Sequence, residues 1–180
     1  KAIDEGAGGL SGAYAQWEYC VQYRETDFNF LSRLMEQEGI YYFFEHTAAK
    51  HTLVLVDDSA THKVTAGYDK VPYFPPTTTD SRRERDHLAA WSCVRSVQPG
   101  AYATTDFDFK TPTTSLLKKQ ERALQHSHAK FEIFDYPAEL PIEADTDPQA
   151  LVAAGSEYWA KVRLQELQGA HLVAQGHGNA

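Results

Sequence analysis

Asp106 and Asp108 are the two side chains whose spacing best suits catalysis. They stand two residues apart in the alternating stretch 101–110, so a strand there would put both carboxylates on one face. Glycoside hydrolases place a pair of carboxylates on either side of the bond that they cleave. Two acids on the solvated face of a strand are far more common than a catalytic pair. We therefore expect no catalysis from these residues.

His126 and His128 form the pattern closest to a metal site. A strand through them would point both rings to one side, where they could share an ion. A zinc site needs further ligands, and no recognisable spacing in the sequence supplies them. We expect surface histidines here. His46 and His51 flank a predicted hairpin loop, and for them we expect a polar pair across two strands.

The other reactive residue types lack the settings in which they act. No Ser lies in the strand–turn–helix setting of a hydrolase nucleophile, and Cys20 and Cys93 match no metal or redox spacing. The glycines within 6–9 are not followed by the Lys and Ser or Thr of a phosphate loop. The sequence predicts a protein that is not an enzyme and that holds no metal or cofactor.

The composition excludes several classes of protein. With 180 residues, of which 42% are hydrophobic, the chain is long and apolar enough to fold around a core. A net charge of −8 argues against nucleic-acid binding, and the basic cluster at 82–85 is interrupted by Glu84. No apolar run approaches the roughly 18 residues of a membrane span. Two distant cysteines fit a reducing compartment, and without a starting Met we expect a piece of a longer protein.

The clearest structural signal is a helix followed by a strand. Thr26 or Asp27 can accept hydrogen bonds from the first free amides of a helix over 27–38. Gly39 stands where a left-handed residue would end that helix, and an aromatic, strand-favouring run follows at 40–44. The helix carries an apolar stripe that we expect to be buried, formed by Phe28, Leu31, Leu34 and Met35.

A β-hairpin is predicted next, with arms at 40–46 and 51–58 around the loop 47–50. Along the second arm, two leucines take one face and two valines take the other. Because both faces are apolar, we expect burial on both sides or contact with a partner chain. Asp57, at the end of this arm, is expected to begin a turn.

The rest of the chain is predicted as short strands and one further helix. Before the first helix we expect a linker at 1–16 and a strand at 17–24. Later strands are expected at 88–98 and 101–110, joined at Pro99–Gly100, and at 130–136, with loops over 59–86 and a short helix or extended excursion at 115–128.

The second helix is predicted over 148–168, with Asp147 as its cap, Pro148 in its first turn and Gly169 as its stop. Its buried side is expected to hold Leu151, Tyr158, Trp159 and Val162. A last strand begins at 171, and we expect its partners outside this chain.

These elements predict an α+β fold, mainly antiparallel β with two amphipathic helices. We divide the chain into four parts. They are a lead-in segment and strand at 1–26, a helix plus β-hairpin unit at 27–58, a loop and small antiparallel β unit at 59–136, and a helix and final strand at 137–180.

The helix–hairpin stretch closely resembles the VgrG family, the spike proteins of bacterial type VI secretion, in the part similar to the hub of contractile phage tails. Its signature residues are Glu25, Thr26, Asp27, Phe28, Phe30, Leu31, Arg33, Leu34, Glu38, Gly39, Ile40, Tyr41, Tyr42 and Phe43. The resemblance continues through 50–58, 99–102, 106–109, 134–137 and the helix that ends near 167, in family order. Ala138 departs from it, since the family usually has Gly there.

The resemblance implies part of a phage-tail-hub-like domain whose role is structural. In this family three copies form a hub that sits on the Hcp tube and carries a β-helical needle. The assembly forms in the bacterial cytoplasm and is then secreted with effectors or adaptors. The resemblance also implies that 137–180 returns toward a barrel module that is incomplete here. The alternatives are a hub protein of a contractile phage or prophage tail and, less favoured, a cell-wall hydrolase domain.

Overall fold

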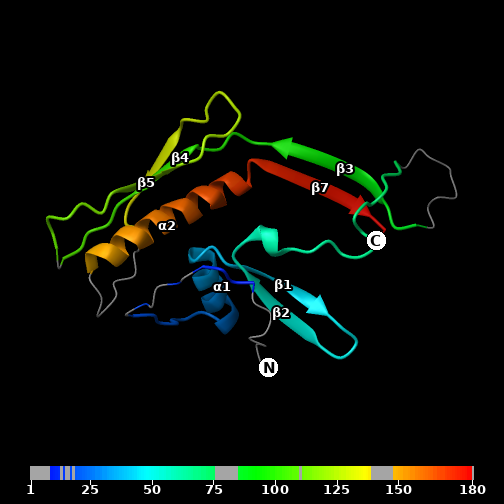
Figure 1. Ribbon diagram of the computed structural model, residues 1–180, viewed down its shortest axis with the longest axis horizontal. Helices are drawn as coiled ribbons and strands as arrows, with labels where there is room; N and C mark the ends of the chain where they lie inside the picture. The colour runs from blue at the N-terminus through cyan, green and yellow to red at the C-terminus, as the bar shows by residue number, and fades with distance from the viewer. Residues whose placement is uncertain are drawn as a thin grey trace.

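The computed structural model describes residues 9–12, 14, 17, 19–75, 85–109, 111–138 and 148–179, with side chains of the last range described from 157 onward. These residues form two α-helices, one short 3-10 turn (Ser59–Thr61) and seven strands in three small sheets. The predicted α+β class is confirmed. Figure 1 shows helix α2 between a sheet on one side and helix α1 with its hairpin on the other.

Helix α1 (Asp27–Gln37) begins and ends where local chemistry predicts. The Thr26 hydroxyl accepts a hydrogen bond from the amide of Asn29 at 3.2 Å, so Thr26 is the cap. Gly39 lies just beyond the helix with φ +69°, a conformation that favours glycine. A Cβ at Gly39 would also lie 3.1 Å from Val162 Cγ2 on helix α2, so the stop of α1 is a contact between the two helices.

Strands β1 (Tyr41–His46) and β2 (His51–Val56) form the predicted antiparallel hairpin. Its loop is closed by a hydrogen bond from Thr47 N to Lys50 O at 2.8 Å. On β2, Val54 and Val56 are buried and the two leucines are partly buried, so the opposite-face prediction is confirmed. We call residues 27–56 the α1–hairpin unit.

Strand β4 (Ala101–Thr104) is the centre of a three-stranded sheet. It pairs antiparallel with β5 (Lys118–Glu121) and parallel with β6 (Glu132–Asp135). All four residues of β4 are buried, because α2 (Pro148–Gly169) packs over β4 and β5. The core cluster here joins Tyr102 to Ala160 and Leu164 of α2, with Leu167 packed against them.

Strands β3 (Leu88–Arg95) and β7 (Leu172–Gly178) form a two-stranded antiparallel sheet, which we call the ribbon. Figure 1 shows it leaving the end of α2 and running away from the three-stranded sheet. Most of its residues are exposed, including every residue of β7. The expectation that the last strand pairs outside this chain is wrong, since β3 is its partner.

The junction between α2 and the ribbon is held by several hydrogen bonds. The Gln168 amide donates to the carbonyls of Pro99, at 3.1 Å, and Arg122, at 2.7 Å. His171 N donates to Gln168 O, and Ser96 N donates to His171 O, both at 2.9 Å. Only Ala170 and His171 separate the helix from β7. The ribbon is thus fixed to the helix at its base.

Three further expectations need correction, and one open alternative is decided. Residues 19–24 form no strand. The strand at 101–110 ends at Thr104, and the strands on either side of Pro99–Gly100 pair with other partners, not with each other. The stretch 115–128 holds strand β5 and turns, so its extended alternative is the one observed.

Some expectations lie outside the described residues, namely Asp147, the side chain of Leu151 and most of the basic cluster at 82–85. The four-part division of the chain stays a prediction. Of the helices described, none combines the length and apolar character needed to cross a membrane.

Candidate functional site

Asp106 and Asp108 lie beyond the end of β4 and not on a shared strand face. An oxygen of Asp106 accepts from the amide of Phe107 at 2.8 Å, and one of Asp108 accepts from the Thr111 hydroxyl at 2.6 Å. Both carboxylates therefore hold local turns. The sequence prediction of a common strand face is wrong. The alternation of polar and apolar residues continues to 109, but the strand itself ends at Thr104.

His126 and His128 lie in a turn, where His128 N donates to His126 Nδ1 at 3.2 Å. Their rings go to different neighbours, His126 beside His171 and His128 beside Phe131. The predicted shared strand face is wrong. Across the described part of the chain, no group of three or more His, Cys, Asp or Glu side chains could hold a metal ion.

His46 and His51 are directly opposite each other at the loop end of the hairpin, with ring centroids 4.7 Å apart. Their Nδ1 atoms are hydrogen-bonded, so one ring provides an N–H and the other a lone pair. The predicted cross-strand pair is confirmed. Cys20 and Cys93 are free and exposed.

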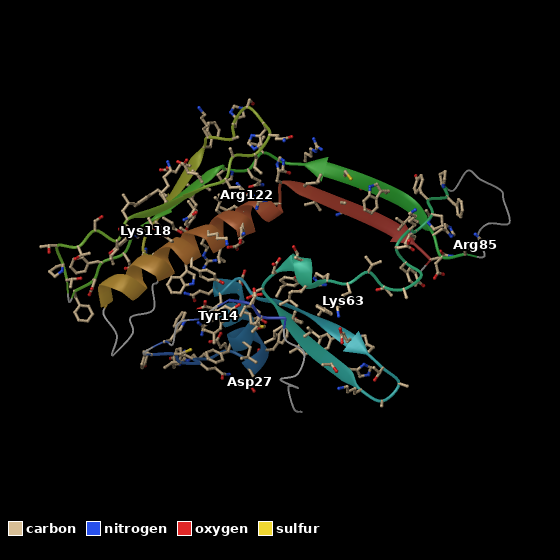
Figure 2. The ribbon with its side chains drawn as sticks, in the orientation of Figure 1. Tyr14, Asp27, Lys63, Arg85, Lys118 and Arg122 are labelled. Atoms are coloured by element: carbon tan, nitrogen blue, oxygen red, sulfur yellow. The ribbon has the colours of Figure 1, made fainter. Side chains whose placement is uncertain are left out.

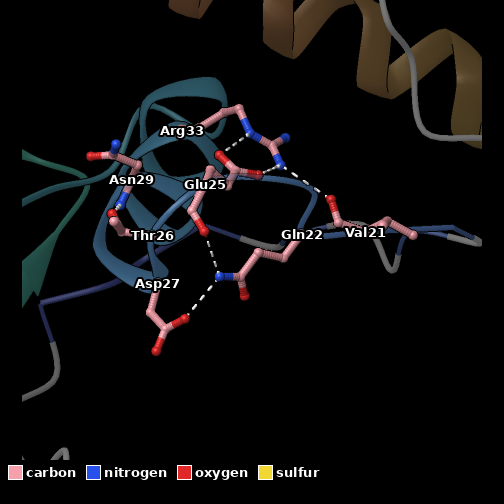
Figure 3. A network of polar contacts seen from close by, with 7 residues as sticks. All are labelled: Val21, Gln22, Glu25, Thr26, Asp27, Asn29 and Arg33. Atoms are coloured by element: carbon pink, nitrogen blue, oxygen red, sulfur yellow. Dashed lines mark hydrogen bonds and ion pairs between the residues drawn. The ribbon is translucent and has the colours of Figure 1, made fainter.

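The first signature residues form a polar network that fixes the entry to α1. Figure 3 shows Arg33 reaching back to Glu25, with a distance of 2.8 Å between Nη2 and Oε1, and on to the Val21 carbonyl. Gln22 donates to the Glu25 carbonyl and to the Asp27 carboxylate at 3.0 and 2.8 Å. The hydrogen bond from Arg33 lowers the pKa of Glu25. These polar signature residues position the backbone and perform no chemistry.

Asp57 binds the beginning of the described chain to the end of β2. Its carboxylate accepts four hydrogen bonds, from Ser11 N at 2.8 Å, Ser11 Oγ at 3.1 Å, Gly12 N at 2.6 Å and Tyr14 OH at 2.7 Å. The Tyr14 hydrogen bond is the largest cause that lowers the pKa of Asp57 to about 2. Figure 2 labels Tyr14 at this junction.

This junction, the Asp57 clamp, was missed by the sequence interpretation. Gly9 also forms a bridge to Val56, and a Cβ at Gly9 would lie 2.3 Å from the Leu55 carbonyl oxygen. The described residues between 9 and 14 are therefore attached to the hairpin, although the sequence predicted a linker. The partners of Asp57 are about 45 positions away, and no local pattern points to them.

Glu38 joins the α1–hairpin unit to α2. Trp17 Nε1 donates to its carboxylate at 3.2 Å, and Tyr158 OH donates to its backbone carbonyl at 2.6 Å. Burial raises the pKa of the Glu38 carboxyl. Since Gly39 also contacts Val162, the end of α1 rests on the side of α2 through adjacent residues.

The apolar stripe of α1 is not sealed in this structure. Leu34 and Met35 are partly buried, but Phe28 is 61% exposed and Leu31 is 50% exposed. The expectation that the whole stripe is buried is wrong for these two residues. None of the fourteen signature residues falls in the buried class. The most recognisable part of the sequence thus contributes surface as well as packing.

The ribbon offers a second exposed apolar surface, with Trp91 55% and Val94 60% exposed. The register pairs Val94 with Val173 on one face, while Trp91 points to the other face and packs near Gly176. A two-stranded sheet open to water on both faces is marginally stable by itself. Together, the stripe of α1 and the ribbon fit surfaces that become covered in an assembly.

Comparison with known proteins identifies relatives along nearly the whole chain. A family model described as phage tail baseplate hub (GPD) matches residues 2–180. The type VI secretion system spike protein VgrG1c of Pseudomonas aeruginosa is 44% identical over 159 residues, which make up 88% of this chain and 20% of that protein.

Two further spike proteins of Pseudomonas aeruginosa are similar to this chain. VgrG1a is 43% identical over 162 residues (90% of this chain, 23% of that protein), and VgrG1b is 42% identical over 171 residues (95% and 22%). The chain thus spans about a fifth of the length of these curated relatives. The resemblance found in the sequence is confirmed.

Proposed function

The chain belongs to the phage tail baseplate hub (GPD) family, and we propose from this membership that it forms part of the hub of a type VI secretion spike. The observation that carries the proposal is the similarity to three secretion spike proteins along nearly the whole chain. The family is defined by a structural part, the hub. This agrees with the expectation that the chain is not an enzyme.

Three copies of the parent protein are proposed to form the hub, which sits on the Hcp tube, carries the needle and travels out of the cell with effectors or adaptors. The exposed ribbon supports a role in assembly. Its two apolar faces would gain stability by joining a larger sheet, through backbone pairing and burial of side chains such as Trp91 and Val94. Such binding needs shape and apolar surface and no reactive group.

The test uses the full-length parent protein with Trp91→Asp in the ribbon and Thr113→Asp, in an exposed turn, as the matched control. Light scattering should show trimers for the wild type and the control and smaller species for Trp91→Asp, because a charge would enter the assembly surface. Secretion of the parent and of Hcp into the medium should be lost with the trimer. The 180-residue chain alone should be monomeric or weakly associating.

Two results would contradict the proposal. If the wild-type parent protein is never found in the medium together with Hcp, the proposed role in secretion is wrong. An unchanged trimer in both Trp91→Asp and Val94→Asp would show that the ribbon is not part of the assembly surface.

A contractile phage or prophage tail hub is the second candidate, favoured by the description of the matched family. Its assembly surfaces would be the same. Dependence on Hcp distinguishes the two, since a phage tail hub would assemble without the secretion tube.

A further inference from the structure

A groove of about 460 Å³ lies beside the three-stranded sheet, on the side of β6 that faces α2. Its walls combine aromatic, apolar and charged side chains, with Tyr102 and Ile133 on the sheet, Trp159 and Glu166 on α2, and Gln37 from the end of α1. None of the predicted catalytic or metal residues lines it. The groove is therefore a separate feature of the fold.

Strand β6 is an edge strand next to this groove. The sheet order is β5-β4-β6, and α2 covers β5 and β4. In the described residues no strand pairs with the outer side of β6, whose residues are all exposed, with Phe134 at 59%. An edge strand presents unpaired backbone N–H and C=O groups to which an extended peptide can add.

Both faces of β6 carry an excess of negative charge. On the groove side, the Asp135 carboxylate accepts from Tyr102 OH at 3.2 Å and from Tyr136 N at 2.8 Å, and in the described chain no cation pairs with it. Glu166 is already paired with Arg163 at 2.9 Å. The groove side is thus left with one unbalanced carboxylate.

On the opposite face, one ammonium group serves two carboxylates. Lys119 Nζ lies 2.6 Å from Glu121 and 2.8 Å from Glu132, which is on β6. One negative charge is again in excess. An incoming strand would therefore meet an unbalanced carboxylate on each face of the sheet.

Trp159 adds a polar group to the groove that has no partner. It is only 6% exposed, and its indole Nε1–H makes no hydrogen bond among the described residues. A buried donor without an acceptor costs about 1–3 kcal/mol. A ligand that brings an acceptor to the groove could remove this cost.

We propose that the groove and the free edge of β6 bind an extended segment of a separate polypeptide, which adds to the sheet as a strand. One apolar side chain of the segment enters the groove, and a basic side chain lies on each face of the sheet. Because neighbouring residues of a strand point to opposite faces, the two basic residues are adjacent and the apolar residue comes two positions from one of them. This inference does not depend on whether the parent serves secretion or a phage tail.

The test is a titration of the 180-residue chain, labelled with ¹⁵N, with the peptide acetyl-Thr-Leu-Lys-Arg-Thr-Val-amide. The amide signals of Ile133, Phe134 and Asp135 and the indole signal of Trp159 should shift together. A peptide with Pro in place of both Thr residues and the Val keeps the Leu, Lys and Arg side chains but loses backbone donors along both edges of the strand, and should bind at least about tenfold more weakly. A peptide with Glu in place of Lys and Arg should fail to bind.

Matched variants on α2 test the charge argument. Glu166→Gln makes the groove side less negative and should weaken binding of the basic peptide about threefold. Glu157→Gln changes a carboxylate that lies 3.7 Å from Lys118, outside the groove lining, and should leave the affinity unchanged. Equal effects of both variants would show a general charge effect and overturn the assignment of the basic residue.

Three results would overturn the proposal as a whole. One is the absence of shifts at β6 and at Trp159 with millimolar peptide. Another is binding of the Pro peptide and of the Glu peptide that is as tight as binding of the original peptide, which would exclude strand addition and charge recognition. The third is a shift of the same signals on simple dilution without peptide, which would identify a second copy of this chain as the occupant.

Discussion

The region around α2 and the ribbon that follows it use their apolar residues in opposite ways. In the first region, β4 is buried on both faces, and Ala160 and Leu164 of α2 are almost fully enclosed. In the ribbon, Trp91, Val94 and Leu172 are each more than half exposed. The first region completes its core within this chain. The ribbon leaves its apolar side chains largely exposed.

The largest effect is expected at Gly100, in the region around α2, where the backbone leaves no room for an added side-chain atom. A Cβ there would lie 1.6 Å from the Ala129 carbonyl oxygen, so Gly100→Ala forces the backbone apart. We expect destabilisation of about 4 kcal/mol or more, measured by urea unfolding. The control is Gly169→Ala, where no atom lies within 4 Å and α2 ends. Equal stability of the two variants would contradict the close approach.

Truncating one apolar side chain in the core around α2 and one in the ribbon tests the comparison directly. Leu164→Ala should destabilise the chain by about 2–5 kcal/mol, because it leaves a cavity in the core with Tyr102 and Ala160. Val94→Ala in the ribbon should change the stability of the chain by less than about 0.5 kcal/mol. Chemical denaturation of both variants measures the difference. A large loss at Val94 would mean that the ribbon already contributes to a core in this chain.

An intermediate effect is expected at the contact between the two helices. Gly39→Ala puts a side chain at φ +69° and 3.1 Å from Val162, and should cost about 1–3 kcal/mol. Gly67→Ala, at φ +86° with no atom within 4 Å, carries the backbone strain alone. The difference between their unfolding free energies isolates the contact with α2. No difference would show that Val162 moves aside freely.

The smallest effect is expected at the Asp57 clamp and depends on pH. The folded-state pKa of Asp57 is about 2, below the ordinary value of 3.8. The clamp therefore contributes its full stability above about pH 4 and loses it as the pH falls toward 2. In Asp57→Asn, the melting temperature should fall less steeply over this range than in the wild type. Asp58→Asn, which alters only the adjacent turn, should retain the wild-type slope.

The elements that could be predicted from the sequence are those fixed by neighbouring residues. The cap at Thr26, the stop at Gly39 and the loop at 47–50 are local, and all three are found as expected. Tertiary pairing was not predictable in this way. Strand β7 pairs with β3, which lies about 80 positions earlier in the chain. The residues of neither strand indicate which other strand is its partner.

The candidate surfaces were harder to predict than the elements. Helical spacing correctly placed Phe28 and Leu31 on one stripe, but spacing gives no information about what covers a stripe. The alternation at 101–110 suggested one solvent-exposed face, whereas all four residues of β4 are buried. The Asp57 clamp depends on residues that are far apart in sequence and polar, so no apolar pattern revealed it.

The hydrogen bonds at the base of the ribbon have a mechanical consequence. Because Gln168 and His171 are hydrogen-bonded to Pro99, Arg122 and Ser96, the start of β7 is held in a fixed position relative to the end of α2. A force applied to the ribbon would therefore reach the three-stranded sheet through these hydrogen bonds to Pro99 and Arg122 as well as through the covalent chain.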